Sequence, residues 1–263
     1  MRATRLRAGG AGLVLLATAV AAAGSAGGAG QPEPPPLPPS EVRAGEELFQ
    51  VACSSCHGLD GRGDEQGPSL IGVGEASVDF YLSTGRMPLD RPDVQAQRKE
   101  PPYTPRQIRQ LVAYVTSLGP SGPQSGGASG GSGLATPEVD LEKGDLSLGN
   151  LLYANNCASC HSSAGAGGAL GHSVYAPRLD KATPTQVAQA VRIGPGAMPR
   201  FGPDTLDDHQ LASVVRYVDY LRHPSDPGGL GLGHLGPLPE GFVAWVVGLG
   251  LMVLAIRWIG TKD

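Results

Sequence analysis

The chain has 263 residues and a formal net charge of −4 at neutral pH, with acidic and basic residues spread over both halves. A basic face, which nucleic-acid binding requires, is not expected, so we exclude nucleic acid as a partner. Glycine (40) and proline (24) together approach a quarter of the chain, while aromatic residues make up only 5%. A small domain of this composition has a thin core if side chains alone fill it.

The N-terminus has the pattern of an export signal. Three arginines precede an apolar run from Ala11 to Ala23, and small residues follow. These three regions in this order direct a chain across a membrane. Residues 1–30 are therefore predicted to be a signal peptide or a retained signal anchor, and both alternatives stay open. The Pro-rich stretch QPEPPPLPPS at 31–40 is expected to be an extended spacer.

Two modules of similar sequence follow. The first is predicted over 41–118 and the second over 138–224, joined by a Gly/Ser-rich linker over 119–137. Gly45 and Gly149 each stand eight residues before the first cysteine of their module. LVAYVTSL near the end of the first module matches VVRYVDYL near the end of the second. The pattern indicates a duplicated domain.

Both modules carry helix start signals and neither carries an alternating strand pattern. The segments 104–107 (TPRQ) and 183–186 (TPTQ) each supply an N-cap threonine, a proline at the first helical position and a capping-box glutamine. A last helix is predicted to open at Thr205 and Asp208. The expected fold class is all-α, and the predicted helix stops are Gly119, Gly194 and a position before Pro224.

The C-terminal segment is apolar over a length that can cross a bilayer. The predicted span, 241–259, follows a juxtamembrane linker at 225–240. About 19 residues at 1.5 Å each give roughly 30 Å, the thickness of the hydrocarbon layer. Trp245 and Trp258 lie near its ends, as interfacial tryptophans do. Basic residues at the end of the span, including Arg257, place the C-terminus in the cytoplasm and the modules outside.

Each module contains one Cys-x-x-Cys-His motif. CSSCHG at 53–58 and CASCHS at 157–162 use all four cysteines, so none remains for a disulfide framework. Two thiols one helical turn apart can add to the vinyl groups of haem, and the next histidine can bind the iron. The predicted cofactors are two covalent haem c groups, attached through Cys53, Cys56, Cys157 and Cys160, with His57 and His161 as iron ligands.

Two other interpretations of the cysteines explain less. A zinc site made by both Cys-x-x-Cys pairs would leave the two histidines unexplained and would have to bridge the modules. A redox dithiol is expected in a βαβ context, which is absent from the sequence pattern.

Each module also contains one methionine after its motif. Met87 lies in TGRMP and Met198 in GPGAMPRFG, 30 and 37 residues after the motif histidines. Glycine and proline suit a loop that brings a side chain onto a ring. Although a lone methionine is usually core filler, we predict that both are axial iron ligands. Met/His ligation raises the potential and fills the coordination sphere, so the iron passes electrons and does not bind oxygen.

Four further histidines and two prolines complete the candidates. The carbonyl of Pro68 or Pro177 could accept the Nδ1–H of the motif histidine, or each could be a simple loop proline. His172 is a minor alternative ligand. Surface or structural roles are expected for His209, His223 and His234.

With these residues, each module resembles a class I cytochrome c domain. The whole chain is similar to the dihaem cytochrome c subunit of the actinobacterial menaquinol–cytochrome c reductase. The passages that carry the similarity are GPSLIGVGEASVDFYLSTGRMP (67–88), NNCASCHSSAGAGGAL (155–170), YAPRLDKATP (175–184) and LGPLPEGFVAW (235–245). The resemblance implies two tandem class I cytochrome c domains and a C-terminal anchor in the cell membrane.

The resemblance also implies partners. Such a subunit takes the place of cytochrome c1 in a bc complex, beside the cytochrome b and Rieske iron–sulfur subunits. It would pass electrons from the Rieske protein to an aa3-type cytochrome c oxidase, and alone it would catalyse nothing. Two alternatives remain: a subunit of a cbb3-type oxidase or of an alcohol or sugar dehydrogenase, and a catalytic dihaem enzyme. The late position of the span disfavours the cbb3 type, and the paired methionines disfavour the enzyme.

Overall fold

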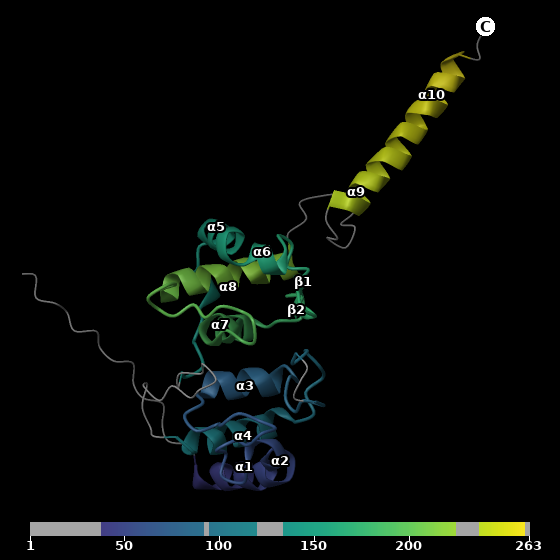
Figure 1. Cartoon of the computed structure of the whole chain (residues 1–263). Coiled ribbons are helices and arrows are strands. Elements are labelled where there is room, and N and C mark those ends of the chain that lie inside the picture. Colours follow the sequence, from purple (N-terminus) through teal and green to yellow (C-terminus); the bar gives the residue numbers. More distant parts are fainter. Residues whose placement is uncertain (1–37, 92–94, 120–133, 225–236, 261–263) are drawn as a thin grey trace, which may run out of the picture. The chain divides into compact units, whose positions relative to one another are not determined.

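The computed structural model describes residues 38–91, 95–119, 134–224 and 237–260 (Figure 1). Over these ranges the chain forms two helical modules and a separate C-terminal helix, which confirms the predicted fold class. The predicted signal segment, most of the Pro-rich spacer and most of the Gly/Ser-rich linker lie outside the described residues.

The first module is built on two crossing helices. Its elements are α1 (Pro39–Ala52), α2 (Ser54–His57), α3 (Glu75–Ser83) and α4 (Pro105–Ser117). Helix α1 packs on α4 at Gly45, where an added Cβ would collide with the Gln110 carbonyl. This close approach buries Phe49 fully against Tyr114, with ring centroids 5.1 Å apart. The glycine therefore sets how near the two helices come.

The second module repeats this order. Its elements are η1 (Leu141–Lys143), α5 (Leu146–Asn156), α6 (Ala158–His161), β1 (Gly168–Gly171), β2 (Val174–Ala176), α7 (Pro184–Ile193) and α8 (Asp208–Arg222). Helix α5 packs on α8 at Gly149, where an added Cβ would collide with the Ser213 carbonyl. Tyr153 lies buried beside this crossing, as Phe49 does in the first module. The predicted repeat therefore extends to the helix packing.

One element was not predicted from the sequence. Strands β1 and β2 form an antiparallel hairpin in which Gly168 pairs with Ala176, and its turn contains positive φ angles at three successive residues, 171–173. All four residues of β1 are exposed. A strand of four exposed residues, two of them glycine, buries no face, so the sequence has no apolar alternation to reveal it.

The helix ends agree with the capping signals at two of three predicted starts. Thr104 and Thr183 each form a capping box with the glutamine three residues later, and Gly194 ends α7 in the left-handed region with φ 63°. The prediction for α8 was wrong by two residues. Asp207, not Thr205, is the N-cap, because its carboxylate accepts the Gln210 N–H while the Gln210 side chain accepts the Asp207 N–H.

The C-terminal helix consists of α9 (Pro237–Val243), a π-helical stretch η2 (Ala244–Leu249) and α10 (Gly250–Gly260). Residues 240–260 are long and apolar enough to cross a membrane, and none of the window that meets this test is buried in the protein. A core helix of a soluble protein would be mostly buried. This helix matches the predicted span within one residue at each end and is the candidate membrane anchor.

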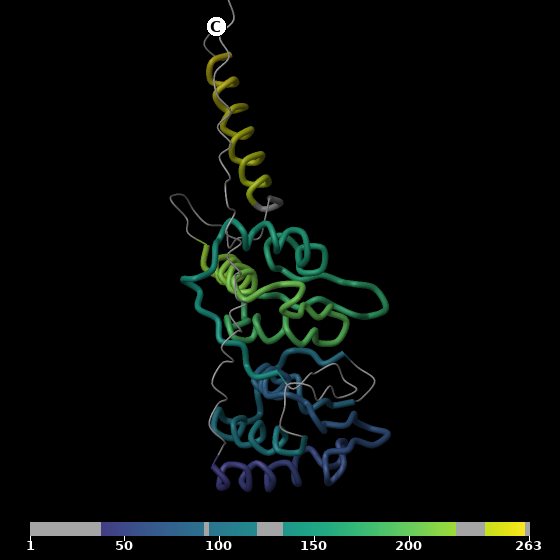
Figure 2. The backbone as a smooth tube through the Cα atoms, turned by 90° about the vertical axis from the view of Figure 1, so that its left-hand side faces the viewer, coloured from purple at the N-terminus to yellow at the C-terminus, as the bar shows by residue number. Residues whose placement is uncertain are grey.

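The two modules meet through α3 and α7 (Figures 1 and 2). Gln189 donates a hydrogen bond to Asp79 at 2.7 Å, and Gln186 donates one to Ser83 at 3.3 Å. Residue numbers rise along α3 while those of the partner residues fall along α7. The two helices therefore run antiparallel. An apolar cluster of Ala76, Phe80 and Ile193 is buried at the same contact.

Candidate functional site

Each module encloses a cavity that its predicted site residues line. The first cavity has a volume of about 450 Å³ and the second about 260 Å³. Cys53, His57 and Met87 line the first cavity, whereas Cys157, Cys160, His161 and Met198 line the second. Residues that lie far apart in the sequence are thus brought together, and only Cys56 among the eight predicted ligands is not part of a cavity wall.

A one-turn helix places the motif residues in both modules. Helix α1 ends just before Cys53, and α2 then carries the chain through a single turn to His57. The His57 N–H donates to the Cys53 carbonyl at 3.0 Å, and the His161 N–H donates to the Cys157 carbonyl at 2.9 Å. The two cysteines of each motif therefore lie one turn apart, followed directly by the histidine.

Both motif histidines are held by proline carbonyls. His57 Nδ1 lies 2.8 Å from the Pro68 carbonyl oxygen, and His161 Nδ1 lies 3.0 Å from the Pro177 carbonyl oxygen. With Nδ1–H as the donor, Nε2 keeps its lone pair for a metal. Of the two roles left open for these prolines, the geometry matches the carbonyl acceptor. A side chain at Gly67 would place its Cβ 3.1 Å from His57 Nδ1.

Burial controls the protonation of these groups. Desolvation, with a smaller contribution from the second cysteine of each motif, raises the pKa of Cys53 and of Cys157 to about 11. Such thiols are not the low-pKa nucleophiles of a redox dithiol. Desolvation also lowers the pKa of His161, against the effect of the hydrogen bond to Pro177, and so favours the neutral imidazole that binds metals.

The zinc alternative finds no support in the part of the chain that the structure describes. Both Cys-x-x-Cys pairs lie within it, and no group of three or more His, Cys, Asp or Glu side chains there could hold a metal ion. The pairs stand in separate modules and do not converge.

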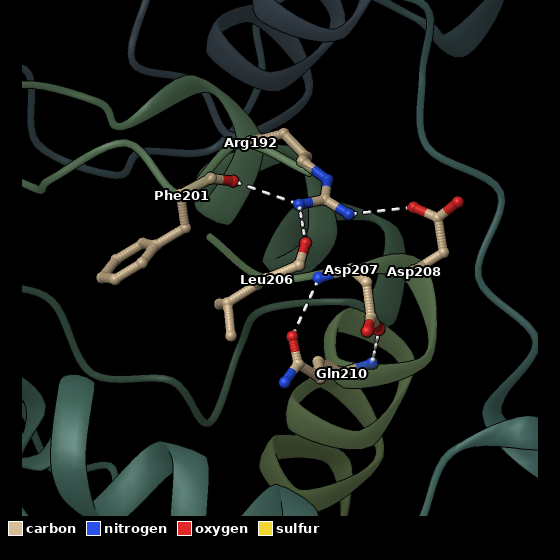
Figure 3. Close-up of polar contacts among 6 residues, drawn as sticks. All are labelled: Arg192, Phe201, Leu206, Asp207, Asp208 and Gln210. Atoms are coloured by element: carbon tan, nitrogen blue, oxygen red, sulfur yellow. Dashed lines mark hydrogen bonds and ion pairs between the residues drawn. The ribbon is translucent and has the colours of Figure 1, made fainter. Parts of the chain in front are cut away.

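The loop that carries Met198 is fixed by a buried arginine that the sequence analysis missed. Arg192, only 4% exposed, donates to the carbonyls of Phe201 (3.2 Å) and Leu206 (2.6 Å) and to the Asp208 carboxylate (2.9 Å) (Figure 3). Its guanidinium thus joins the end of α7, the loop and the first turn of α8. An arginine within an amphipathic helix ordinarily indicates a solvent-facing position, so no sequence signal distinguished it.

Each cavity is also walled by the other module. Residues 193–196 of the second module line the first cavity, and Tyr81, Arg86 and 95–98 of the first module line the second. Tyr81 lines both cavities. Burial raises the pKa of its hydroxyl, while Arg86 and a hydrogen bond from the Gly196 backbone oppose that rise. This sharing depends on contacts between the modules, which no motif in the sequence indicates.

The remaining histidines that the structure describes, His172, His209 and His223, line neither cavity. His172 is exposed at the hairpin turn with φ 48° and lines neither cavity, so the minor alternative ligand is not placed for that role. His209 lies in the first turn of α8 and His223 at its C-cap, whereas His234 lies outside the described residues.

Known proteins resemble the chain over both modules. A family profile described as "Cytochrome c" matches residues 42–119, and one described as "Cytochrome C oxidase, cbb3-type, subunit III" matches residues 144–218. The cytochrome bc1 complex cytochrome c subunit of Corynebacterium efficiens is 38% identical over 230 residues, which are 84% of this chain and 77% of the relative. The subunit of that name from Mycobacterium tuberculosis is 41% identical over 223 residues, 84% and 78% of the two chains.

More distant similarities follow. The cbb3-type cytochrome c oxidase subunit FixP of Rhizobium meliloti is 28% identical over 66% of this chain and 59% of its own length. A solved chain of a reducing HAO-like protein complex from Kuenenia stuttgartiensis is 18% identical with a TM-score of 0.35, covering 68% of this chain and 95% of that one. That last likeness is too weak to support an argument about fold.

The profile matches establish two cytochrome c domains, and domains of this kind bind haem c covalently. The bc1-complex relatives exceed 35% identity over most of both chains, and their name supports an electron-transfer role. The chain belongs to the family of cytochrome c subunits of the bc1 complex.

Proposed function

We propose that the chain is a membrane-anchored dihaem cytochrome c of the respiratory chain. It transfers electrons from the Rieske iron–sulfur protein of a menaquinol-oxidising bc complex to a terminal cytochrome c oxidase of the aa3 type. The observation that carries the proposal is the same in both modules: a motif histidine, oriented by a proline carbonyl, shares a cavity with the module's methionine.

We propose one domain over residues 41–118 and another over residues 138–224. The residues that line the cavity of each domain fit a haem. The first cavity, about 450 Å³, falls within the usual range of ligand sites and the second, about 260 Å³, lies just below it. The cavity walls supply thiol, imidazole and thioether groups. Arg86 adds a buried cation at the second cavity, and among the described residues its Nη1 atom has no hydrogen-bond partner. Cys53, Cys56, Cys157 and Cys160 would form the thioether bonds, with His57, Met87, His161 and Met198 as axial ligands.

A bound haem supplies a one-electron iron couple. The proline carbonyls hold the imidazoles in one orientation and one tautomer, so that Nε2 faces the cavity. With haem bound, Met87 and Met198 would keep oxygen and other ligands from the iron and would favour its reduced state. Apolar walls exclude water, which also favours the less charged, reduced site. These residues therefore support electron transfer and not ligand chemistry.

Membership of the bc1-complex family supports the proposed partners within that complex, the cytochrome b and Rieske subunits. The C-terminal helix supports a place in the cell membrane, since residues 240–260 can cross it and contact lipid. Arg257 near the cytoplasmic end of this span and the export pattern at 1–30 support haem domains on the extracytoplasmic side.

A pull-down from native membranes in mild detergent tests the proposal. We expect this chain to co-purify with cytochrome b, Rieske and oxidase subunits, and the preparation to consume oxygen with menaquinol without added cytochrome c. A tag on an unrelated membrane protein controls for incomplete solubilisation. Recovery of the chain alone, or with a dehydrogenase, would overturn the assignment of partners.

A subunit of a cbb3-type oxidase is the second candidate, favoured by the profile match over residues 144–218 and by the similarity to FixP. The same purification separates the two. A cbb3-type assignment requires recovery with an oxidase in the absence of cytochrome b and Rieske subunits.

A further inference from the structure

Arg86 of the first module reaches the cavity of the second. It follows Gly85, which ends the turn after α3 with φ 64°, and its side chain lines the second cavity but not the first. The residue is only 8% exposed. Its guanidinium carbon lies 4.8 Å from the centroid of the Phe80 ring, so an aromatic face of the module contact supports one side of the cation.

This buried cation lacks an anion. Nη1 of Arg86 is inaccessible to solvent and has no hydrogen-bond partner, and no salt bridge joins Arg86 to a carboxylate among the described residues. A buried charge without a partner lowers the stability of the folded protein, because its lost hydration is not replaced. Among the described residues, no side chain uses this binding capacity of Arg86.

A second arginine lines the same cavity. Arg98, also from the first module, donates from Nη2 to the neutral Gln186 side-chain oxygen at 3.0 Å. Arg98 lies close enough to Arg86 for the two charges to interact. Asp180 acts on Arg98 electrostatically but forms its salt bridge with Arg178. Three guanidinium groups thus line this cavity, those of Arg86, Arg98 and the exposed Arg178, and the most buried one, Arg86, has no carboxylate partner among the described residues.

We propose that Arg86, with Arg98 beside it, binds a carboxylate of the prosthetic group in the second cavity, so that the first module completes the cofactor site of the second. The proposal rests on the proposed function. Haem carries two propionate carboxylates at one edge, and the planar guanidinium fork binds a carboxylate through two parallel hydrogen bonds. A propionate would neutralise the unpaired charge at Arg86.

The segment of the second module that lines the first cavity supplies no such cation. Gly194 ends α7 in the same left-handed conformation as Gly85, with φ 63°, and the residue after it is Pro195. The segment 193–196, which covers the first cavity, contains no charged side chain. The two modules therefore differ at this position, and only the second cavity receives a cation from the other module.

Redox titration of the purified full-length holoprotein tests the proposal. The two haem groups give two potential components, and a Met198→His variant identifies the second because it lowers that component. We expect Arg86→Gln to lower the second component more than the first, because removing a cation near the iron stabilises the oxidised state. Arg86→Lys, which keeps the charge but not the fork, should lower it less.

Arg62→Gln is the matched control. It removes the same charge from the same module, but the Arg62 side chain is 77% exposed and lines neither cavity. Both components should keep their potentials. A merely structural role for Arg86 predicts lower thermal stability in Arg86→Gln with an unchanged difference between the two components, and that result would overturn the proposal.

Resonance Raman spectra give a second readout, because propionate bending modes respond to hydrogen bonds at the carboxylate. The difference spectrum between Arg86→Gln and wild type should show a shift in the second haem's propionate mode. A shift confined to the first haem would assign Arg86 to its own module and refute the proposal. Failure of the two-haem function itself is distinguishable, since haem quantification would then give fewer than two groups per wild-type chain.

Discussion

Whether the sulfur atoms of Met87 and Met198 bind iron decides between an electron carrier and a catalytic dihaem protein. Both side chains are half-buried and line the cavities that also hold the motif histidines. A thioether ligand raises the potential and leaves no open position on the iron. An enzyme of the peroxidase kind would need such a position on one of its irons.

Replacing Met198 with alanine should open the second site. We expect the thioether–iron charge-transfer band to lose about half its intensity, and the potential of one component to fall by about 0.1 V or more, within the ~0.8 V range that axial ligands set. Carbon monoxide should then bind one reduced haem per chain. Met252→Leu, in the apolar span, is the control and should change none of these. An unchanged spectrum in Met198→Ala would remove the methionine from the coordination sphere.

The loop between α7 and α8 depends on one buried cation at the scale of secondary-structure elements. Arg192→Met keeps the apolar stem but leaves the carbonyls of Phe201 and Leu206 without a donor. Each unsatisfied buried group costs about 1–3 kcal/mol, so we expect unfolding free energy to fall by about 2–5 kcal/mol, measured by denaturant titration. The Met198 charge-transfer band should weaken as the loop loosens.

The ion pair between Arg192 and Asp208 should contribute much less to the free energy of unfolding than the hydrogen bonds to the loop carbonyls. The Asp208 side chain is 92% exposed, so Asp208→Asn should cost less than about 1 kcal/mol. Equal losses in the two variants would show that the arginine acts through its ion pair and not through the carbonyls of the loop.

The helix crossings have a glycine requirement. Gly149→Ala places a methyl group against the Ser213 carbonyl, so α5 and α8 must separate, at a cost we put at about 3 kcal/mol, the upper part of the usual range for overpacking. Thermal unfolding of the holoprotein measures it. Gly202→Ala is the control in the same module, since an added Cβ there meets nothing within 4 Å. Comparable midpoints of thermal unfolding in the two variants would contradict the close packing of α5 on α8.

The anchor is tested on the whole molecule. A chain that ends at residue 224 lacks the helix over 237–260, and we expect most of it to leave the membrane in an alkaline carbonate wash while keeping both haem groups. Full-length protein, washed in parallel, should stay with the membrane. Retention of the shortened chain would instead assign a second anchor to the predicted signal segment at 1–30.

Local chemistry indicated most of the candidate residues that line the two cavities, and two of the three predicted helix starts. The Cys-x-x-Cys-His motifs, the capping threonines and the helix-crossing glycines act on neighbours within a few residues or repeat at a fixed offset. Arg192, Tyr81 and Arg86 escaped prediction because their roles depend on tertiary contacts, two of them between modules. The hairpin escaped because it buries no apolar face, and Thr205 was chosen over Asp207 because both residue types are good N-caps.

The shared walls of the two cavities have a consequence for how the protein matures. Enzymes that attach haem must reach both thiols of each motif, yet residues 193–196 and residues 95–98 cover each cavity from the opposite module. We therefore expect attachment in each separate module first, and closure of α3 against α7 only afterwards. In such an order the finished cofactors are enclosed last, and the contact between the modules marks the end of biogenesis.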